Sequence, residues 1–225
     1  MTAHVNFILT EQSRKKVGEK RVLRIMRRLG LKCITRIPGP VYLKCPSGKI
    51  EDNLLNRKFS PQSTNISWAT DFTYLKFNHG KNHIWMSAVI DLYSREIIGW
   101  KLCEVPTANE AIDTFKIAFS KFPNVNPLIH TDRGSTYTAI DFNNFLTENE
   151  CVQSMSRPGT PYDNSIMESW WNVFKTDWFY TEANELNNLE DVIKLIEDGI
   201  KYFNTERRTQ RKNGFTPEEL REKSA

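Results

Sequence analysis

Three carboxylates, Asp71, Asp132 and Glu168, have the chemical type and the local context to hold a divalent metal ion for phosphoryl transfer. Mg²⁺ prefers hard oxygen ligands and keeps positions open for water and phosphate oxygens, so an enzyme without a nucleotide-binding loop usually supplies carboxylates. Asp71 lies inside the strand-like run "SWATDFTYLKF", and Asp132 ends the run "LIHTD". Taken singly, these residues also fit a solvated strand position and the start of a turn.

The position of Asp132 adds weight to the metal interpretation. Gly134 follows it, where the backbone turns toward the next helix. Ligands in open α/β sheets tend to bind beyond the carboxyl ends of strands. We therefore expect Asp132 to lie at the edge of the sheet where ligands bind.

Glu168 can be placed on one face of a helix. The Asp163-Asn164 pair after Pro161 is a natural N-cap, and we expect the helix to run to about Tyr180. At 100° per residue, Asn164 and Lys175 lie within roughly 40° of Glu168. The apolar row on the opposite side predicts the buried stripe: Ile166, Trp170 and Val173. A carboxylate and an ammonium group then project from one exposed face, although a solvated face with scattered charges fits the helix equally well.

The elements that position these side chains follow the order βββαβαβ and are followed by helices. Three strand-like runs form an antiparallel meander, and two further short strands are each reached through a helix. The expected strands are 67–77, 83–94, 95–104, 128–132 and 152–157, and the expected helices are 108–122 and 137–149. This order predicts an α/β fold with the mixed sheet of the ribonuclease-H-like class.

The charge of the chain is divided unevenly. The 225 residues carry a formal net charge of +4, but residues 1–60 hold 14 Lys/Arg against 4 Asp/Glu, or +10, and the remainder sums to −6. In a predicted helix over 17–31, which Gly30 ends, basic side chains alternate with apolar ones: Arg21, Arg24, Arg27 and Arg28. We expect a basic helical segment and linker over 1–60, a core over 61–225, and nucleic acid as a partner.

Composition also excludes several classes. No run approaches the ~18 apolar residues of a membrane span, and the N-terminus lacks a secretory signal, so we expect neither a membrane nor a secreted protein. Four widely spaced cysteines form no CxxC motif, which argues against a disulfide framework and a thiolate zinc site. A reducing cytoplasm is the expected location.

Three motifs taken together, "WATDFTY", "HTDRGSTY" and "MSRPGTPYDNSIMESWWNVFKTD", resemble the catalytic core of DDE transposases and retroviral-type integrases. The resemblance is strongest to the OrfB-type transposases of the IS-three family of bacterial insertion sequences. Asp132 and Glu168 are separated by 168 − 132 − 1 = 35 residues, and Lys175 falls seven residues after Glu168, as in that family. The resemblance covers roughly 68–220.

The resemblance implies that Asp71, Asp132 and Glu168 form the metal-binding catalytic triad, with two Mg²⁺ (or Mn²⁺) ions. It also implies metal-dependent cleavage and strand transfer of insertion-sequence ends into target DNA, by a homo-oligomer on double-stranded DNA in the bacterial nucleoid. Lys175 and Asn164 would hold DNA near the cleavage point, and Tyr162 would stack on an unpaired base or serve as a rim aromatic. Asp91 belongs to a strand phrase of the family and is excluded from the triad.

Some features depart from the family pattern. The run "KKVGEKRVLRIMRRLGLKC" resembles the end of a helix-turn-helix-like region, so we expect its upstream part to be missing and a protein from an upstream reading frame to be a possible partner. The pair His79 and His83 invites a zinc interpretation, but it falls in a predicted hairpin without a following CxxC, so exposed histidines are expected. Two alternatives stay open: a ribonuclease-H-like nuclease without strand transfer, and a decayed or domesticated DNA-binding remnant.

Overall fold

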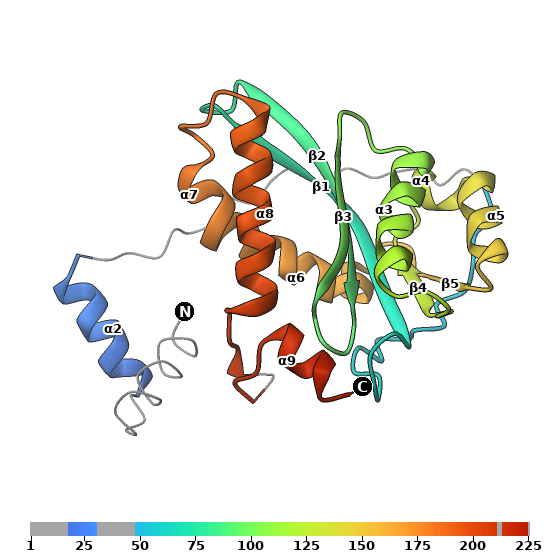
Figure 1. The fold of residues 1–225 in the computed structure, drawn as a ribbon, viewed down its shortest axis with the longest axis horizontal. Coiled ribbons are helices and arrows are strands. Elements are labelled where there is room, and N and C mark those ends of the chain that lie inside the picture. The colour runs from blue at the N-terminus through green and yellow to red at the C-terminus, as the bar shows by residue number, and fades with distance from the viewer. Residues whose placement is uncertain (1–17, 31–47, 211–212, 225) are drawn as a thin grey trace.

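A computed structural model describes residues 18–30, 48–210 and 213–224 of the chain (Figure 1). Its centre is one five-stranded sheet in the order β3-β2-β1-β4-β5. The strands are β1 (Ser67–Phe77), β2 (Asn82–Asp91), β3 (Ile97–Cys103), β4 (Leu128–Thr131) and β5 (Val152–Met155). β1, β2 and β3 pair antiparallel, whereas β4 pairs parallel with both β1 and β5. The predicted order of elements and the ribonuclease-H-like class of the fold are confirmed.

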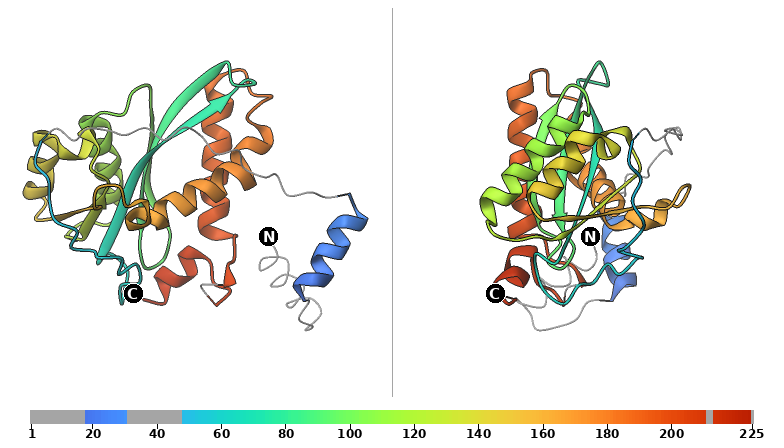
Figure 2. Two further views of the ribbon diagram at one scale, coloured as in Figure 1. Left: turned by 180° about the vertical axis from the view of Figure 1, so that it is seen from behind. Right: turned by 90° about the vertical axis from the view of Figure 1, so that its right-hand side faces the viewer.

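Helices cover both faces of this sheet, as the three views show (Figures 1 and 2). One face packs against α3 (Ala108–Lys121) and α5 (Ile140–Glu148), which α4 (Ser135–Thr138) precedes; the other packs against α6 (Ser165–Phe174) and α8 (Leu189–Thr205). Alternation along β1 explains the division, since Ala69 and Leu75 join the α6/α8 core while Trp68 joins the α3/α5 core. As predicted, Asp71 shares its side of β1 with Ala69 and Leu75.

One glycine sets the distance between β3 and α3. A Cβ atom on Gly99 would lie 2.7 Å from the carbonyl oxygen of Thr114 and 3.1 Å from the backbone nitrogen of Ala118. Real Cβ atoms do not approach backbone so closely. The absence of a side chain at this strand position therefore lets the helix pack directly on the sheet.

The helix that carries Glu168 differs from its prediction in two ways. A 3₁₀ turn, η1 (Pro161–Asn164), precedes α6, and α6 is followed by a π-helical turn, η2 (Lys175–Phe179), and α7 (Tyr180–Glu182). The fully buried side of α6 is also a different row: Met167, Trp171 and Phe174. The predicted stripe of Ile166, Trp170 and Val173 is only half-buried and lines a cavity of about 480 Å³. The predicted buried stripe was wrong, because a helical wheel shows only which apolar residues share a row. Packing against the sheet and the other helices decides which row is buried.

The basic helix near the N-terminus is present as α2 (Glu19–Arg28), shorter than the predicted 17–31. Gly30 adopts a left-handed φ of 68° just after it, as expected of a glycine that ends a helix. Figures 1 and 2 show α2 apart from the sheet and its covering helices. Of the predicted basic segment and linker over 1–60, residues 1–17 and 31–47 lie outside the described residues, and 48–60 form no helix or strand.

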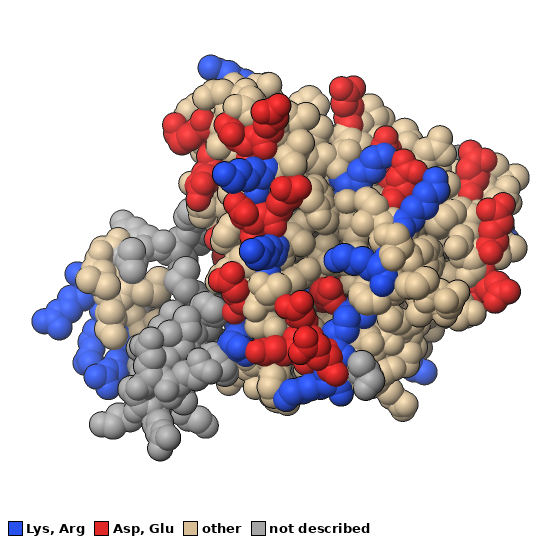
Figure 3. All heavy atoms as spheres, viewed as in Figure 1, with Lys and Arg blue, Asp and Glu red and all other residues tan. Residues whose placement is uncertain are grey.

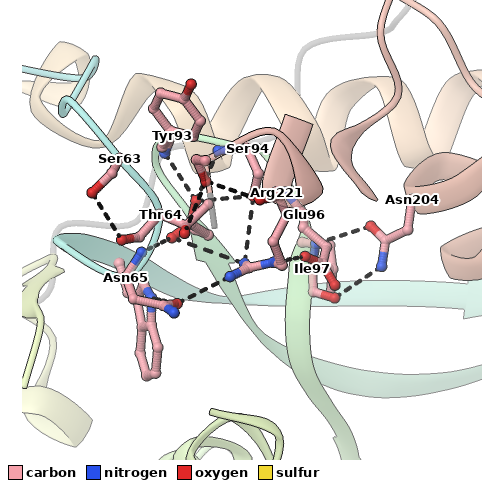
Figure 4. A network of polar contacts seen from close by, with 12 residues as sticks. Ser63, Thr64, Asn65, Tyr93, Ser94, Glu96, Ile97, Asn204 and Arg221 are labelled. Carbon is pink, nitrogen blue, oxygen red and sulfur yellow. Dashed lines mark hydrogen bonds and ion pairs between the residues drawn. The ribbon is translucent and has the colours of Figure 1, made fainter. Parts of the chain in front are cut away.

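Asp91 has a structural role at the start of β1. Fully buried, it accepts hydrogen bonds from the backbone nitrogens of Asn65 and Ser94 at 2.8 Å each. Arg221, in the C-terminal helix α9 (Pro217–Glu222), bonds to Glu96 and, at 3.1 Å, to Asn65 Oδ1 (Figure 4). The network therefore fastens α9 and the entry to β1 onto the β2–β3 turn.

Among the described helices, none is long and apolar enough to cross a membrane.

Candidate active site

The parallel pairing of β1 with β4 brings Asp71 and Asp132 together. The register matches Trp68 with Ile129 and Ala69 with His130. Continued by two residues, this register sets Asp71 opposite Asp132, just beyond the last residue of β4. Because residues in register on neighbouring strands point to the same face of the sheet, the two carboxylates, 61 positions apart in sequence, lie on the same side.

Backbone hydrogen bonds orient both carboxylates. Asp132 Oδ1 accepts from the backbone nitrogen of Gly134 at 2.7 Å, and Asp71 Oδ1 accepts from that of Phe72 at 2.8 Å. A Cβ atom on Gly134 would lie 2.8 Å from Asp132 Oδ1. A side chain at position 134 would therefore displace the Asp132 carboxylate, which adds a packing reason for the glycine at this predicted turn.

Tyr137 is a residue of this site that sequence analysis missed. Only 2% of it is exposed, and its hydroxyl lies 3.4 Å from Thr70 Oγ1. Burial raises the pKa of the Tyr137 hydroxyl well above its usual value, and the charges of Asp71 and Asp132 raise it further. Both carboxylates therefore act on the same buried hydroxyl. The signal was the last letter of "HTDRGSTY", which lies on the buried side of a short helix.

Asn164 joins the helix of Glu168 to β1. It is 5% exposed, and its Nδ2 donates to the carbonyl of Thr70, the residue before Asp71, at 3.4 Å. The N-cap position is as predicted, but its side chain makes no cap hydrogen bond. Asn164 Oδ1 is buried and has no hydrogen-bond partner among the described residues.

Glu168 lies one helical turn beyond Asn164, on the first turn of α6. The residue is exposed, as the helical wheel predicted. The atoms packed around its carboxylate raise its pKa above the usual value of Glu by removing water. A desolvated carboxylate gains more from a cation than a fully hydrated one, which suits a metal ligand.

The donor set of the site is one that Mg²⁺ prefers. Asp71, Asp132 and Glu168 offer hard carboxylate oxygens, and Asn164 adds a buried amide oxygen without a partner. Within the described part of the chain, no three His, Cys, Asp or Glu side chains converge closely enough to form a metal cluster. Two of the candidate ligands come from β1 and the end of β4, and the third lies on a helix that is hydrogen-bonded to β1 at Thr70.

The other predicted site residues lie at different distances from this centre. Lys175, half-buried, follows α6 at the start of the π-helical turn, and Tyr162, 71% exposed, lies in η1. The α2 arginines are all exposed and do not gather with the carboxylates: Arg21, Arg24, Arg27 and Arg28. Figure 3 shows basic side chains projecting from α2, whereas acidic and basic side chains mix over α8. His79 and His83 are exposed, as expected.

His130 supports the site from within β4. It is fully buried, and its ring nitrogens lie 3.0 Å from Ser154 Oγ and 3.2 Å from Ser156 Oγ. Burial lowers the pKa of His130 from 6.5 to about 4, so the ring is neutral at pH 7. It joins β4 to β5 two residues before Asp132, a role that no sequence motif announced.

Comparisons with known proteins agree with this geometry. Residues 61–161 and 149–217 match two families that are both described as the integrase core domain. The magnesium complex of the HTLV-2 integrase catalytic core domain superimposes with a TM-score of 0.58 at 18% identity, over 71% of this chain and 98% of that one. Fold and sequence matches together define a protein with an integrase catalytic core.

Two relatives narrow the class. An uncharacterized transposase-like protein of Haemophilus influenzae is 35% identical over 93% of this chain and 95% of its own length. Transposase InsF for insertion sequence IS3A of Escherichia coli is 32% identical, over 91% of this chain and 71% of its own length. The chain belongs to the OrfB-type transposases of the IS-three insertion-sequence family.

Proposed function

We propose that this protein is a DDE-type polynucleotidyl transferase that cuts DNA at the ends of an insertion sequence and joins them to target DNA. The observation that carries the proposal is the register that sets Asp71 beside Asp132, with the helix of Glu168 bonded to β1 at Thr70. The hard oxygen donors suit metal-assisted direct attack at phosphorus by water and then by a DNA 3′-hydroxyl, which needs no covalent enzyme intermediate.

Asp71, Asp132 and Glu168 would hold the metal. Bound Mg²⁺ or Mn²⁺, two ions in our proposal, supplies Lewis-acid activation of phosphate oxygens. The magnesium complex of the HTLV-2 core supports the choice of ion. The protein's part is to orient the three carboxylates, which the backbone bonds of Asp71 and Asp132 support.

The DNA contacts divide between two regions. Lys175, Asn164 and Tyr162 would contact DNA near the scissile bond, since they belong to the turns that flank α6. Asn164 does so only at the base of the site, because it is buried. In residues 1–60, the exposed arginines of α2 would neutralise backbone phosphates without sequence readout.

The partners follow from this division of labour. We propose that residues 61–225 act as the catalytic core and 1–60 as its basic arm, in a homo-oligomer that pairs two DNA ends. A helix-turn-helix protein from an upstream reading frame would supply end recognition, in the cytoplasm of a bacterium. Nothing in the described helices requires a membrane.

The test uses the purified protein and duplex oligonucleotides that carry the DNA flanking its own gene. Incubation with Mg²⁺ should give a nick at one position and, with a second duplex, covalently joined strands on a denaturing gel. EDTA should abolish both products. Cleavage without joining or end preference would mark a nuclease, and binding without cleavage would mark a DNA-binding remnant.

A further inference from the structure

A buried carboxylate, Asp163, ties separate parts of the chain together directly before the helix that carries Glu168. Asp163 has no exposed surface. Its two oxygens accept five hydrogen bonds, three of them from Arg157: the backbone nitrogen at 3.0 Å and Nε and Nη2 at 2.9 Å each. Arg57 Nε and Asn53 Nδ2 each donate at 2.7 Å. We call these four residues the Asp163 cluster.

The charges of the Asp163 cluster favour a fixed geometry. The hydrogen bond from Arg157 is the largest cause that holds the pKa of Asp163 far below its usual range, so this carboxylate is ionised at any physiological pH. Charge-assisted bonds to a guanidinium are both stronger and more directional than neutral ones. The side chains of Arg57 and Arg157 are 46% and 47% exposed, so water would hydrate both if the carboxylate were removed. Replacement of Asp163 would therefore leave no buried cation without a partner.

The next residues lead into the catalytic centre. Asn164 follows Asp163 and bonds to the carbonyl of Thr70, and Glu168 lies one turn further along α6. Between β5 and this point the chain runs through residues 156–160, where Arg133 Nε donates to the carbonyl of Ser156 at 2.7 Å. The Asp163 cluster is thus the densest set of bonds between the end of β5 and Glu168.

The cluster also reaches back to the segment that enters the core. Asn53 and Arg57 precede β1, and the same segment runs beside β5: Leu55 N donates to Ser154 Oγ at 2.9 Å, and Met155 N donates to the carbonyl of Asp52 at 3.2 Å. In sequence this segment leads from the basic N-terminal region to the core. Its position and that of α6 are therefore coupled through one carboxylate.

We propose that Asp163 is a positioning residue, which holds the helix of Glu168 in place beside Asp71 and Asp132 and, through Arg57, makes that place depend on the segment 52–57. For its effect on catalysis the inference rests on the proposed function. It goes beyond that function in assigning the link between the N-terminal region and the catalytic helix. A purely local structural role would leave Glu168 and the segment 52–57 independent.

The first experiment measures hydrogen exchange in the full chain as wild type, Asp163→Asn, Arg57→Gln and Asp91→Asn. Asp91 is the matched control, because it is an equally buried, multiply bonded aspartate whose hydrogen bonds come from Asn65 and Ser94 rather than from the Asp163 cluster. In Asp163→Asn, amides of 157–168 and of 52–57 should exchange about tenfold or more faster, and those of β1–β3 should not change. Arg57→Gln should give a smaller rise in both segments, and Asp91→Asn none in either.

The second experiment separates chemistry from binding. With saturating DNA and Mg²⁺, the nicking rate constant of Asp163→Asn should fall by about 10- to 100-fold, as expected for a misplaced catalytic group. DNA affinity without metal should stay within about twofold, since backbone contacts dominate it. Asp91→Asn should keep its rate per folded molecule.

Three results would overturn the inference. The first two are exchange in 157–168 that Asp163→Asn leaves unchanged and an equal rise there in Asp91→Asn. The third is an unaltered nicking rate in Asp163→Asn beside an active wild type. If the wild type cuts no DNA at all, the proposed function fails by itself. The exchange measurement still decides whether Asp163 positions the helix.

Discussion

The side-chain amide of Asn164 donates to the backbone carbonyl of Thr70 at 3.4 Å, which binds the first turn of α6 to the strand position just before Asp71. This contact spans 94 residues of sequence. This contact holds the helix of Glu168 against β1, the strand that carries Asp71.

The triad assignment is tested by Asp71→Asn, Asp132→Asn and Glu168→Gln. Each amide keeps the shape of the side chain but removes the charge that a metal ligand needs, so nicking with Mg²⁺ or Mn²⁺ should fall to the level without protein. For exposed Glu168, the free energy of unfolding should change by no more than about 0.5 kcal/mol. Plasmid nicking and urea denaturation measure the two effects.

Asp91→Asn is the control for this series. Its buried network should weaken, which lowers the unfolding free energy, but nicking per folded molecule should persist. Substantial nicking by Glu168→Gln would remove Glu168 from the triad.

Gly134→Ala tests the orientation of Asp132. The added Cβ would come within 2.8 Å of Asp132 Oδ1, so the carboxylate must move, and nicking should drop by about 10- to 100-fold. The backbone of Gly134 has an ordinary φ of −65°, so the unfolding free energy should change little. Gly18→Ala, where a Cβ would meet nothing within 4 Å, is the control and should be fully active. Equal rates for both variants would refute the argument.

Lys175→Ala tests the predicted DNA contact beside the site. Loss of one phosphate contact should weaken binding of a cleavable end by about five- to tenfold and lower the salt slope by about one unit. The Mg²⁺ concentration for half-maximal nicking should not move, because Lys175 is no metal ligand. Lys194→Ala, at an exposed position on α8, is the control. Unchanged end binding would show that Lys175 makes no DNA contact.

The basic helix α2 is tested by replacing its four arginines, Arg21, Arg24, Arg27 and Arg28, with Gln in the full chain. If all four contact phosphates, the slope of log affinity against log salt should flatten by about 3.6 units. Filter binding of one duplex at several salt concentrations gives the slope. The control is a Lys194→Gln, Lys201→Gln double variant, which removes exposed charge from α8. This variant should keep the wild-type salt slope. If the α2 variant keeps the wild-type salt slope, the four arginines of the wild type do not contact DNA phosphates and contact another protein instead.

His130 gives the fold a defined dependence on pH. Its pKa is lowered from 6.5 to about 4 by burial, so the unfolded chain binds a proton in this window that the folded chain does not. Stability from this residue is therefore complete above pH 6.5 and is lost as the pH falls toward 4, by about 3 kcal/mol. Urea denaturation at several pH values gives the unfolding free energy as a function of pH. Between pH 6.5 and 4 this free energy should fall less steeply for His130→Gln than for the wild type.

The control for His130 is His83→Gln, an exposed histidine whose loss should leave the pH dependence as in the wild type. A wild-type unfolding free energy that stays constant between pH 6.5 and 4 would contradict the buried, neutral ring.

By itself the sequence determined the order of elements and the triad candidates. Strand alternation placed Asp71 on the side of β1 shared with Ala69, and helical spacing placed Glu168 on an exposed face, because both depend only on the local geometry of the backbone. The separation of 35 residues between Asp132 and Glu168 carried the family resemblance.

Only the tertiary structure decided what those elements touch. The helical wheel predicted that the row of Trp170 is buried, but the fully buried row is that of Trp171, because the sheet and its neighbouring helices decide which row is covered. The local sequence predicts Asp163 to be a helix cap. Its carboxylate instead accepts hydrogen bonds from two guanidinium groups, one of them 106 residues away in sequence. Tyr137 beneath the carboxylates was equally hidden. Such contacts join residues distant in sequence, and local propensity carries no information about the packing that brings them together.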